Sequence, residues 1–310
     1  MGRRRVVLEP FGFASVLSQL ADRLELHGWD GSGEPPADLL ERVELYVMPY
    51  TFAPVTGELI RRMPNVRIVQ TLTAGVEHVL PYLRDGLTLC NARGVHDAST
   101  AELAVALILA SLRGVPDYVR GQDREEWRFG QRPSLADRTV LIVGYGSIGA
   151  AVESRLRPFE CDVMRVARRA REGVAGLEAL PSILGWADVV VLTVPLTEQT
   201  RGMVDAGFLA RMRDGALLVN VARGPIVDTD ALLAELRTGR LSAALDVTDP
   251  EPLPTGHPLW SAPGLLLSPH VGGNTTAFLP RATKLVQDQL ERYAAGEPLV
   301  NVVLAGGSDS

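Results

Sequence analysis

The sequence predicts an α/β fold with doubly wound parallel sheets. Short runs rich in valine, isoleucine and leucine alternate with segments of helical pattern along most of the chain. This alternation favours parallel strands with helices on both faces of the sheet. The length of 310 residues exceeds that of a usual single domain and predicts two. Hydrophobic residues make up 46% of the chain and charged residues 22%, which is the balance of an ordinary globular protein.

The first domain is expected to be a small α/β sheet. Its strands are predicted at residues 6–8, 43–48 and 66–72, and the series ends near Leu89.

A helix and an arm are expected next. The nearly unbroken apolar run over 99–112 predicts a buried helix. The segment 116–133 is polar and lacks clear periodicity, so we expect an exposed arm or loop there. For Trp127 in this segment, and for Trp260, packing against other side chains is preferred over lining a pocket.

The second series has about six predicted strands, the number expected of a complete dinucleotide-binding domain. A helix predicted at 278–294 lies beyond the last strand, and its return would complete the first domain. We therefore expect one domain over 1–97 and 277–310 and the other over 98–276. The six strands are predicted at residues 140–143, 163–167, 189–194, 217–221, 243–247 and 265–268.

A glycine-rich turn carries the clearest motif. It follows the first strand of the second series, opens a helix predicted to run to about Leu156, and reads Gly144-Tyr145-Gly146-Ser147-Ile148-Gly149. In a G-x-G-x-x-G turn the first glycine permits the tight turn, the second lets backbone N–H groups approach a pyrophosphate, and the third allows close helix–strand packing. The motif predicts a Rossmann-like site in which these six residues bind NAD(P), and a simple strand-to-helix turn is the alternative.

The end of the next strand indicates which nicotinamide cofactor is preferred. An acidic residue there would bind the ribose 2′-OH of NAD, but the position holds Ala167, followed by Arg168 and Arg169. Guanidinium groups bind a 2′-phosphate. We therefore predict NADP(H) in preference to NAD(H), which stays possible. The alternative is that both arginines are solvated loop residues.

The composition indicates which classes of partner are not expected. A net charge of −6 and a pI near 5.5 argue against nucleic acid. Cys90 and Cys161 have neither metal-ligand spacing nor the pattern of a disulfide framework, which fits a reducing cytosol and predicts no metal. The longest apolar stretch, 103–112, is too short to span a bilayer. We expect a cytoplasmic protein that binds no membrane.

Polar residues at strand ends mark a second candidate site. His270 is one of five histidines and follows the last predicted strand, and Arg223 follows another strand. Functional groups gather at the carboxyl ends of the strands in open α/β sheets. A histidine at such an edge is a candidate proton donor or acceptor, and a packed or surface histidine is the alternative by position alone.

Several segments in order resemble the D-isomer-specific 2-hydroxyacid dehydrogenase family, which contains glyoxylate/hydroxypyruvate reductases, phosphoglycerate dehydrogenases and formate dehydrogenases. The resemblance extends from about Val66 to Val302. The segments that carry it are 91–94, 194–197, 200–202, 219–228, 243–253, 257–260 and 268–270.

The resemblance implies roles for individual residues. Arg223 would hold the substrate carboxylate and carbonyl oxygen. His270 would be the acid that protonates the carbonyl during reduction, and Glu251 would pair with it and favour the protonated imidazole. Asp246 would lie near the nicotinamide end of the cofactor, and Pro195 falls in a segment implied to bind the cofactor.

The resemblance also implies a substrate and an assembly. The loop Thr73-Ala74-Gly75 resembles the family's substrate loop, whose backbone N–H groups bind the carboxylate. The substrate would be a small 2-oxo or 2-hydroxy acid in a cleft between the nucleotide-binding domain and the discontinuous substrate domain. The helix at 99–112 and the arm at 116–133 would form a symmetric homodimer.

Other interpretations stay open at this point. Taken singly, Arg223, Glu251 and Asp246 are explained as surface charges or caps. An NAD-dependent dehydrogenase of another small substrate is the alternative within the class. A nicotinamide-sensing corepressor that binds partner peptides is the alternative outside it, and the lack of long disordered tails favours the enzyme.

A few residues are expected to act structurally. Asp228 is predicted to cap a helix that starts near Ala231. His78 and His96 are interpreted as structural or peripheral. Glu160 stands where the family resemblance expects glycine, which should affect only a surface turn.

Overall fold

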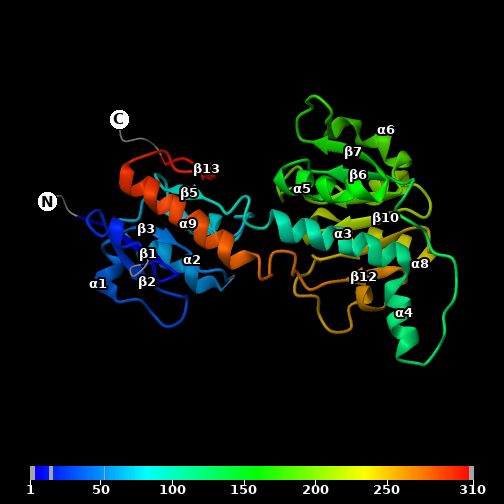
Figure 1. Ribbon diagram of the computed structural model, residues 1–310, viewed down its shortest axis with the longest axis horizontal. Helices are drawn as coiled ribbons and strands as arrows, with labels where there is room; N and C mark the ends of the chain where they lie inside the picture. Colours follow the sequence, from blue (N-terminus) through cyan, green and yellow to red (C-terminus); the bar gives the residue numbers. More distant parts are fainter. Residues whose placement is uncertain (1–3, 14–16, 52, 307–310) are drawn as a thin grey trace. The chain divides into compact units, whose positions relative to one another are not determined.

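The computed structural model describes residues 4–13, 17–51 and 53–306. The chain divides into two units, which we call unit 1 (Met1–His96 and Thr276–Ser310) and unit 2 (Asp97–Thr275). Each boundary lies one residue from the division expected from the sequence. Figure 1 shows that each unit is a sheet flanked by helices.

Unit 1 contains a six-stranded sheet in the order β13-β5-β4-β3-β1-β2. All neighbouring pairs are parallel except β13 with β5. The order 2-1-3-4-5 is one of the two common doubly wound arrangements. The strands at 6–8, 43–48 and 66–72 are confirmed, whereas β2, β5 and β13 were not predicted as strands. The strands are β1 (Arg5–Glu9), β2 (Leu24–Gly28), β3 (Val43–Val47), β4 (Ile68–Gln70), β5 (Thr88–Cys90) and β13 (Val302–Leu304).

Helices cover both faces of this sheet because side chains alternate along each strand. Val7 and Leu45 pack with one core that contains α9 (Phe278–Ala295), while Val6 and Tyr46 pack with the core on the other face. The second face is covered by α1 (Ala37–Leu40) and α2 (Pro54–Arg61). The C-terminal helix therefore returns to complete unit 1, as predicted.

Unit 2 contains a seven-stranded, all-parallel sheet in the order β12-β11-β10-β9-β6-β7-β8. The six predicted strands are confirmed with slightly shifted ends, and the two-residue β8 extends the edge. The strands are β6 (Thr139–Val143), β7 (Asp162–Ala167), β8 (Ala175–Gly176), β9 (Val189–Leu192), β10 (Leu217–Asn220), β11 (Ser242–Leu245) and β12 (Leu265–Leu267).

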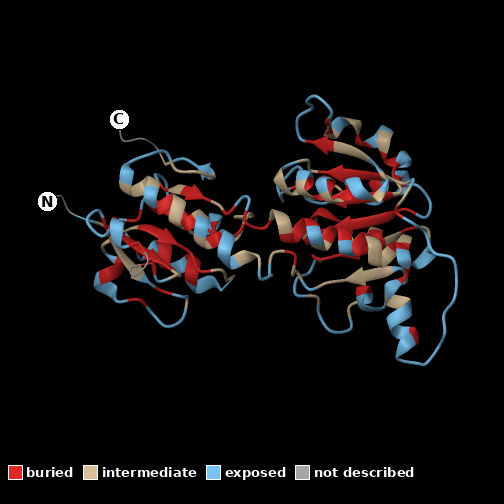
Figure 2. Ribbon diagram, in the orientation of Figure 1, coloured by how far each residue is buried: buried red, intermediate tan, exposed pale blue. Residues whose placement is uncertain are grey.

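Two helical layers enclose this sheet, and Figure 2 shows burial concentrated on the strands and on the adjacent helix surfaces. Val140 and Ile142 of β6 pack under α3 and α5, and Leu141 and Val143 pack under the opposite layer. Such strands, buried on both faces, are characteristic of parallel sheets. The helices are α3 (Asp97–Arg113) and α5 (Ser147–Leu156) on one face, and α6 (Leu180–Ile183), α7 (Ala206–Arg211) and α8 (Thr229–Thr238) on the other.

The strand order of unit 2 reverses between β6 and β9. In open α/β sheets, ligands bind outside the carboxyl ends of the strands at such a switch point. The glycine motif follows β6, and the segment from Thr193 to Thr200 follows β9. The fold therefore places the motif at the position where a dinucleotide is expected.

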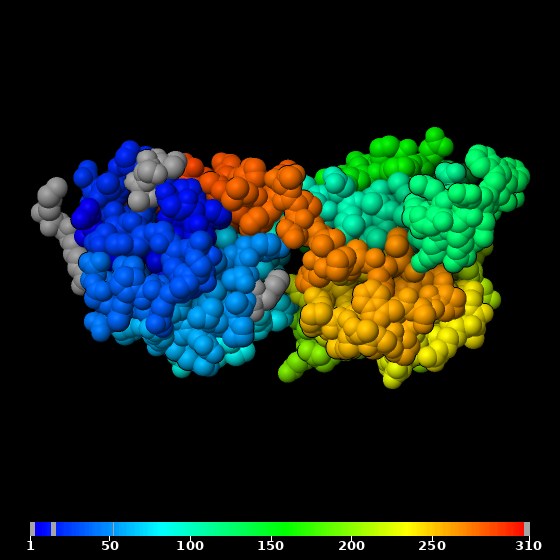
Figure 3. All heavy atoms as spheres, turned by 90° about the horizontal axis from the view of Figure 1, so that it is seen from below, coloured from blue at the N-terminus to red at the C-terminus, as the bar shows by residue number. Residues whose placement is uncertain are grey.

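The arm prediction is partly wrong. Residues Val115–Gln122 form helix α4, which begins after Gly114 in the left-handed region (φ 66°) with a proline in its first turn. The helical spacing is carried by three exposed apolar residues, Val115, Tyr118 and Val119. The surrounding residues are polar, so the segment as a whole shows no clear amphipathic pattern. The rest of the segment is irregular. Figure 3 shows α4 and the segment after it, in green, at the surface of unit 2.

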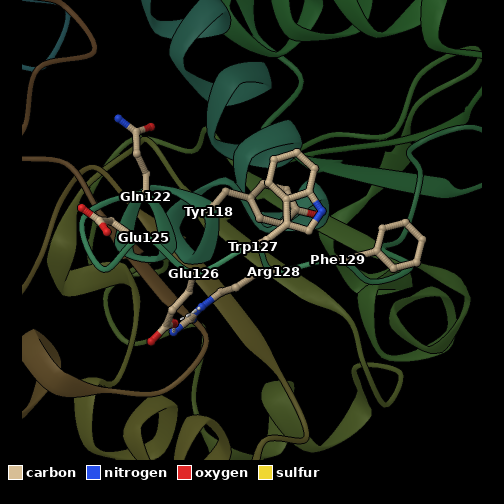
Figure 4. A pocket seen from close by; sticks show the side chains of 7 residues that line it. All are labelled: Tyr118, Gln122, Glu125, Glu126, Trp127, Arg128 and Phe129. Atoms are coloured by element: carbon tan, nitrogen blue, oxygen red, sulfur yellow. Dashed lines mark hydrogen bonds and ion pairs between the residues drawn. The ribbon is translucent and has the colours of Figure 1, made fainter.

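The packing prediction for the two tryptophans is also wrong. Trp127 is 95% exposed and Trp260 59% exposed. Trp127 lines an open cavity of about 570 Å³ with Tyr118, and Phe129 extends from the same segment (Figure 4).

Three smaller features follow from local chemistry. The Asp228 side chain accepts a hydrogen bond from the Ala231 N–H at 3.0 Å and caps α8, as predicted. Glu160 is exposed with φ 56°, the left-handed conformation that favours glycine. Among the described residues no single helix is long and apolar enough to cross a membrane. Only α3 and α4 taken together, bent by 67°, have the necessary length and composition.

Candidate active site

The three glycines of the motif occupy three different environments. A Cβ atom on Gly144, whose φ is 106°, would lie 2.5 Å from the backbone N of Val194. A Cβ on Gly149 would lie 2.7 Å from the Gly144 carbonyl oxygen, whereas a Cβ on Gly146 would meet nothing within 4 Å. The first and third positions therefore need glycine for chain packing. The second leaves open space where a ligand can approach the backbone.

The motif residues face different directions. Gly144, Tyr145 and Gly146 line a groove, whereas the Ser147 hydroxyl hydrogen-bonds Asp97 at 3.2 Å and Ile148 packs against the core beneath α3 and α5.

The groove at the switch point has a volume of about 690 Å³. Arg168 lines it, directly after Ala167 at the end of β7, while the exposed Arg169 is not among its lining residues. Pro195 lines the opposite side, and its carbonyl accepts a hydrogen bond from the Thr200 hydroxyl at 2.6 Å. A nucleotide in this groove would meet one arginine side chain beyond β7.

A buried ion-pair network, which the sequence did not reveal, fixes the Tyr145 side chain. Glu153 of α5 is 4% exposed, and its carboxylate accepts hydrogen bonds from Arg165 of β7 and from the Tyr145 hydroxyl. The Arg165 hydrogen bond is the main cause that lowers the pKa of Glu153 to about 2. Arg171 donates to the Tyr145 carbonyl at 2.6 Å and lies over its ring. The network joins the glycine turn to the loop that carries Arg168.

A histidine–carboxylate pair lies at the other end of the sheet's carboxyl edge. Nδ1 of His270 hydrogen-bonds Oε1 of Glu251, and both side chains are about one-third exposed. Both line a cavity of about 350 Å³ in unit 2 whose walls are otherwise largely apolar. Its other lining residues are Asp246, Thr248, Pro252, Leu253, Trp260, Leu267, Ser268 and Pro269.

The charge state of Glu251 reflects opposing effects. Burial is the largest single influence and would raise its pKa. The hydrogen bond and charge of His270, a backbone hydrogen bond from Thr248 and the charge of Arg223 together outweigh burial and lower the pKa. Glu251 is therefore ionised at neutral pH, and its carboxylate faces the imidazole.

Asp246 holds the loop that presents His270. Its Oδ1 accepts hydrogen bonds from the Ser268 hydroxyl at 2.6 Å and the Val271 N–H at 2.9 Å, and its Oδ2 accepts one from the Gly272 N–H at 2.9 Å. The His270 N–H donates to the Asp246 carbonyl at 2.7 Å, and His270 itself has φ 53°. These bonds stabilise a conformation that a non-glycine residue rarely adopts.

Arg223 is positioned by residues that the sequence analysis missed. The Asn220 amide donates to the Arg223 carbonyl at 2.9 Å, and the Arg223 guanidinium donates to the Ala222 carbonyl at 2.7 Å. A Cβ on Gly224 would lie 1.8 Å from the Thr248 carbonyl oxygen. Only glycine at 224 therefore lets this turn approach the segment that leads to Glu251. The Arg-Gly-Pro sequence was the available signal.

The loop Thr73-Ala74-Gly75 lies in unit 1, after the carboxyl end of β4. Its carbonyl groups are held: that of Thr73 by the Ala92 N–H at 2.9 Å, that of Ala74 by the Asn91 amide at 2.8 Å, and that of Gly75 by the Thr73 hydroxyl at 2.7 Å. No acceptor for the backbone N–H groups of Ala74 and Gly75 occurs within the described part of the chain.

These features define a class of protein. Unit 2 is doubly wound and carries a G-x-G-x-x-G turn at its switch point. An imidazole–carboxylate pair lies at the same edge of the sheet. Together they form the framework of a nicotinamide-dependent dehydrogenase. Across the described ranges, no group of three or more His, Cys, Asp or Glu residues is arranged to hold a metal ion.

Comparison with known proteins identifies the family. Residues 105–272 match the family description "D-isomer specific 2-hydroxyacid dehydrogenase, NAD binding domain". Human glyoxylate reductase/hydroxypyruvate reductase is 31% identical over 304 residues, which cover 92% of each chain. The chain belongs to the D-isomer specific 2-hydroxyacid dehydrogenase family and is an NAD(P)-dependent oxidoreductase.

Two solved structures share the fold over nearly the full length. The D-isomer specific 2-hydroxyacid dehydrogenase from Xanthobacter autotrophicus Py2, in complex with NADPH and MES, is 30% identical with a TM-score of 0.78, covering 97% of this chain and 98% of the other. The NAD-dependent formate dehydrogenase from Staphylococcus aureus, in complex with NAD, is 25% identical with a TM-score of 0.75, covering 97% and 99%.

Proposed function

We propose that this dehydrogenase reduces a small 2-oxo acid, such as glyoxylate or hydroxypyruvate, and prefers NADPH to NADH. The observation that carries the reaction class is the pairing of His270 with Glu251 beside a cavity of the cofactor-binding unit.

His270 supplies the proton in this proposal. Glu251 accepts the hydrogen bond from Nδ1, which leaves Nε2–H of the imidazolium to donate to the substrate carbonyl. A reduced nicotinamide held in the groove would supply the hydride that the carbonyl carbon needs. The proton from Nε2 then completes the hydroxyl group, and the ionised Glu251 stabilises the imidazolium until that transfer.

Arg223 and the loop of unit 1 bind the substrate carboxylate in this proposal. The charge of Arg223 acts on Glu251, so the guanidinium belongs to the same electrostatic environment as the pair. The N–H groups of Ala74 and Gly75 are oriented by the hydrogen bonds on their neighbouring carbonyls. Donors held in place before the ligand arrives need little reorganisation when they bind it. Asp246, buried beside the pair, would also lie near the nicotinamide carboxamide.

The cofactor preference is inferred from the β7 end. Ala167 presents no carboxylate that would repel a 2′-phosphate, and Arg168 lines the groove with a guanidinium that would bind one. Arg169 follows and is exposed. We expect kcat/KM with NADPH to exceed that with NADH by at least about tenfold, the effect of one charge-assisted hydrogen bond. In Arg168→Ala the advantage should largely disappear. Equal efficiencies with the two cofactors in the native protein contradict the preference.

The assembly proposed is a symmetric homodimer built on α3 and the arm. The exposed apolar residues of α4 and the exposed Trp127 fit a surface that another subunit covers. Light scattering is expected to give twice the chain mass, and a monomer would count against the proposal.

A substrate panel tests the function directly. NADPH oxidation is followed by the loss of absorbance of the reduced nicotinamide with glyoxylate, hydroxypyruvate, pyruvate and phenylpyruvate. We expect turnover with the smaller acids. Tight NADPH binding without turnover of any of these acids would refute the proposed substrate class.

A further inference from the structure

A buried histidine of unit 1 lies beside the substrate loop but has no role in the proposed chemistry. His96 is 6% exposed and is the last residue of the first segment of unit 1. Its imidazole stacks on Phe278, with ring centres 5.4 Å apart and planes inclined by 9°, and on Tyr50 at 5.5 Å and 26°. Tyr50 and Phe278 also contact each other at 4.2 Å. The two aromatic rings therefore lie on the same side of the imidazole and form one cluster with it.

The imidazole also contacts the chain just before the loop. Nε2 of His96 lies 2.8 Å from the carbonyl oxygen of Leu72, which is itself buried. A carbonyl oxygen only accepts hydrogen bonds, so Nε2 carries the hydrogen and donates it. The contact places the His96 side chain next to the first residue of the loop, Thr73.

This bond completes a series along the loop. A peptide group is planar, so a fixed carbonyl also fixes the direction of the following N–H. The carbonyl of Thr73 accepts from the Ala92 N–H, and that of Ala74 accepts from the Asn91 amide. The carbonyl of Gly75 accepts from the Thr73 hydroxyl. His96 holds the carbonyl before them. All four consecutive peptide planes at the start of the loop are thereby oriented.

The hydrogen bond from His96 is protected in two ways. The aromatic stack limits the rotation of its ring, and burial keeps water from replacing its bond to Leu72. Loss of this donor leaves a buried carbonyl without its partner, and rotation of that peptide would turn the N–H of Thr73 and displace the loop.

We propose that His96 is a positioning residue for the substrate loop, which it orients for carboxylate binding through the Leu72 carbonyl. The inference rests on the proposed function of that loop. It assigns His96 to substrate affinity and not to proton transfer, since its contact is with the backbone of the loop.

Variants separate the ring from the donor. His96→Phe keeps a stacking ring and removes the N–H, and we expect it to raise KM for the 2-oxo acid about tenfold, the loss of one buried hydrogen bond. His96→Gln places an amide N–H near the position of Nε2, and its KM should lie within about threefold of the native value. In both variants kcat should change less than KM, and the Kd for NADPH, measured by fluorescence titration, should stay within about twofold.

Two further variants keep the test decisive. His96→Asn is polar but too short to reach Leu72, so it should resemble His96→Phe, and it replaces that variant if the phenylalanine prevents folding. His27→Phe is the matched control, because His27 lies on the edge strand β2 and contacts Glu25. It should leave KM unchanged.

The outcomes distinguish the role of His96 from the proposed reductase function. Turnover by the native protein with an unchanged KM in His96→Phe or His96→Asn would overturn the role of His96 alone, as would a glutamine variant no better than phenylalanine. Absence of turnover in the native protein would overturn the proposed function, and the inference with it.

Discussion

Substitution of alanine at two glycines of the cofactor loop should separate cofactor binding from folding. At Gly146 an added Cβ meets nothing within 4 Å, and the backbone angles (φ −98°, ψ −154°) are open to alanine. At Gly144 the Cβ would lie 2.5 Å from the Val194 backbone, at φ 106°. The same chemical change is therefore neutral for the unliganded chain at one position and severe at the other.

The expected magnitudes follow from these geometries. Gly144→Ala combines an unfavourable backbone conformation with a clash against backbone, and together they cost about 3–5 kcal/mol of the free energy of unfolding. Gly146→Ala should change that free energy by less than about 1 kcal/mol. Its methyl group, however, occupies the space through which the N–H groups reach the pyrophosphate. Loss of one charge-assisted hydrogen bond raises the Kd about ten- to hundredfold.

Thermal unfolding by circular dichroism and titration of NADPH fluorescence measure the two effects. Gly130→Ala is the control, because its Cβ also enters open space but lies in the arm, away from the groove. We expect Gly146→Ala to unfold at nearly the native temperature and to bind NADPH weakly. Native-like NADPH affinity in Gly146→Ala would refute the assignment of this groove to the pyrophosphate.

Three further changes probe charge and backbone. Glu251→Gln removes the carboxylate that accepts the hydrogen bond of His270 Nδ1 and lies ionised beside the imidazole. The kcat for the 2-oxo acid should fall while the Kd for NADPH stays unchanged, and an unchanged kcat would contradict the pairing. The pKa of Glu153 is lowered from 4.5 to about 2, mainly by the hydrogen bond from Arg165. Ionisation of Glu153 therefore adds about 3 kcal/mol to the free energy of unfolding. This stabilisation is fully present above pH 4.5 and is lost as the pH falls toward 2. Glu153→Gln should lower the free energy of unfolding in urea by about that amount at pH 7 and by much less at pH 3. An equal decrease at both pH values would count against the ion pair. Glu160→Gly removes the backbone strain of a non-glycine residue in the left-handed conformation and should raise the free energy of unfolding by about 0.5–1 kcal/mol. A lower Tm would show that the glutamate makes a compensating contact.

Much of the fold was predictable because its elements are regular. The parallel strands of unit 2 are buried on both faces, so they appear as short continuous apolar runs. The amphipathic helix α9 was predicted at 278–294 and observed at Phe278–Ala295. Two short strands were not predicted, because β8 has only two residues and β13 is an exposed edge strand of three. For α4, exposed apolar residues within a polar segment hid the helical spacing.

The parts of the site that lie within short sequence motifs were predictable. The glycine motif and the series that leads to His270 are local in sequence, and the structure pairs His270 with Glu251. Contacts between distant segments were not predictable. The bond from His96 to Leu72 spans 24 positions, and no periodicity reveals it. Glu153 and Arg165 meet because a helix and a strand pack together, which only the tertiary structure specifies.

The most direct test of the account is the rate of the chemical step without His270. The best acid of the panel is reduced at saturating NADPH by the native protein and by His270→Ala, with the NADPH Kd measured for both. We expect His270→Ala to have a kcat lower by about 10²–10⁴-fold, the contribution of a general acid, and an unchanged Kd for NADPH. A variant that keeps a tenth or more of the native kcat would contradict the assignment of His270 as the proton donor.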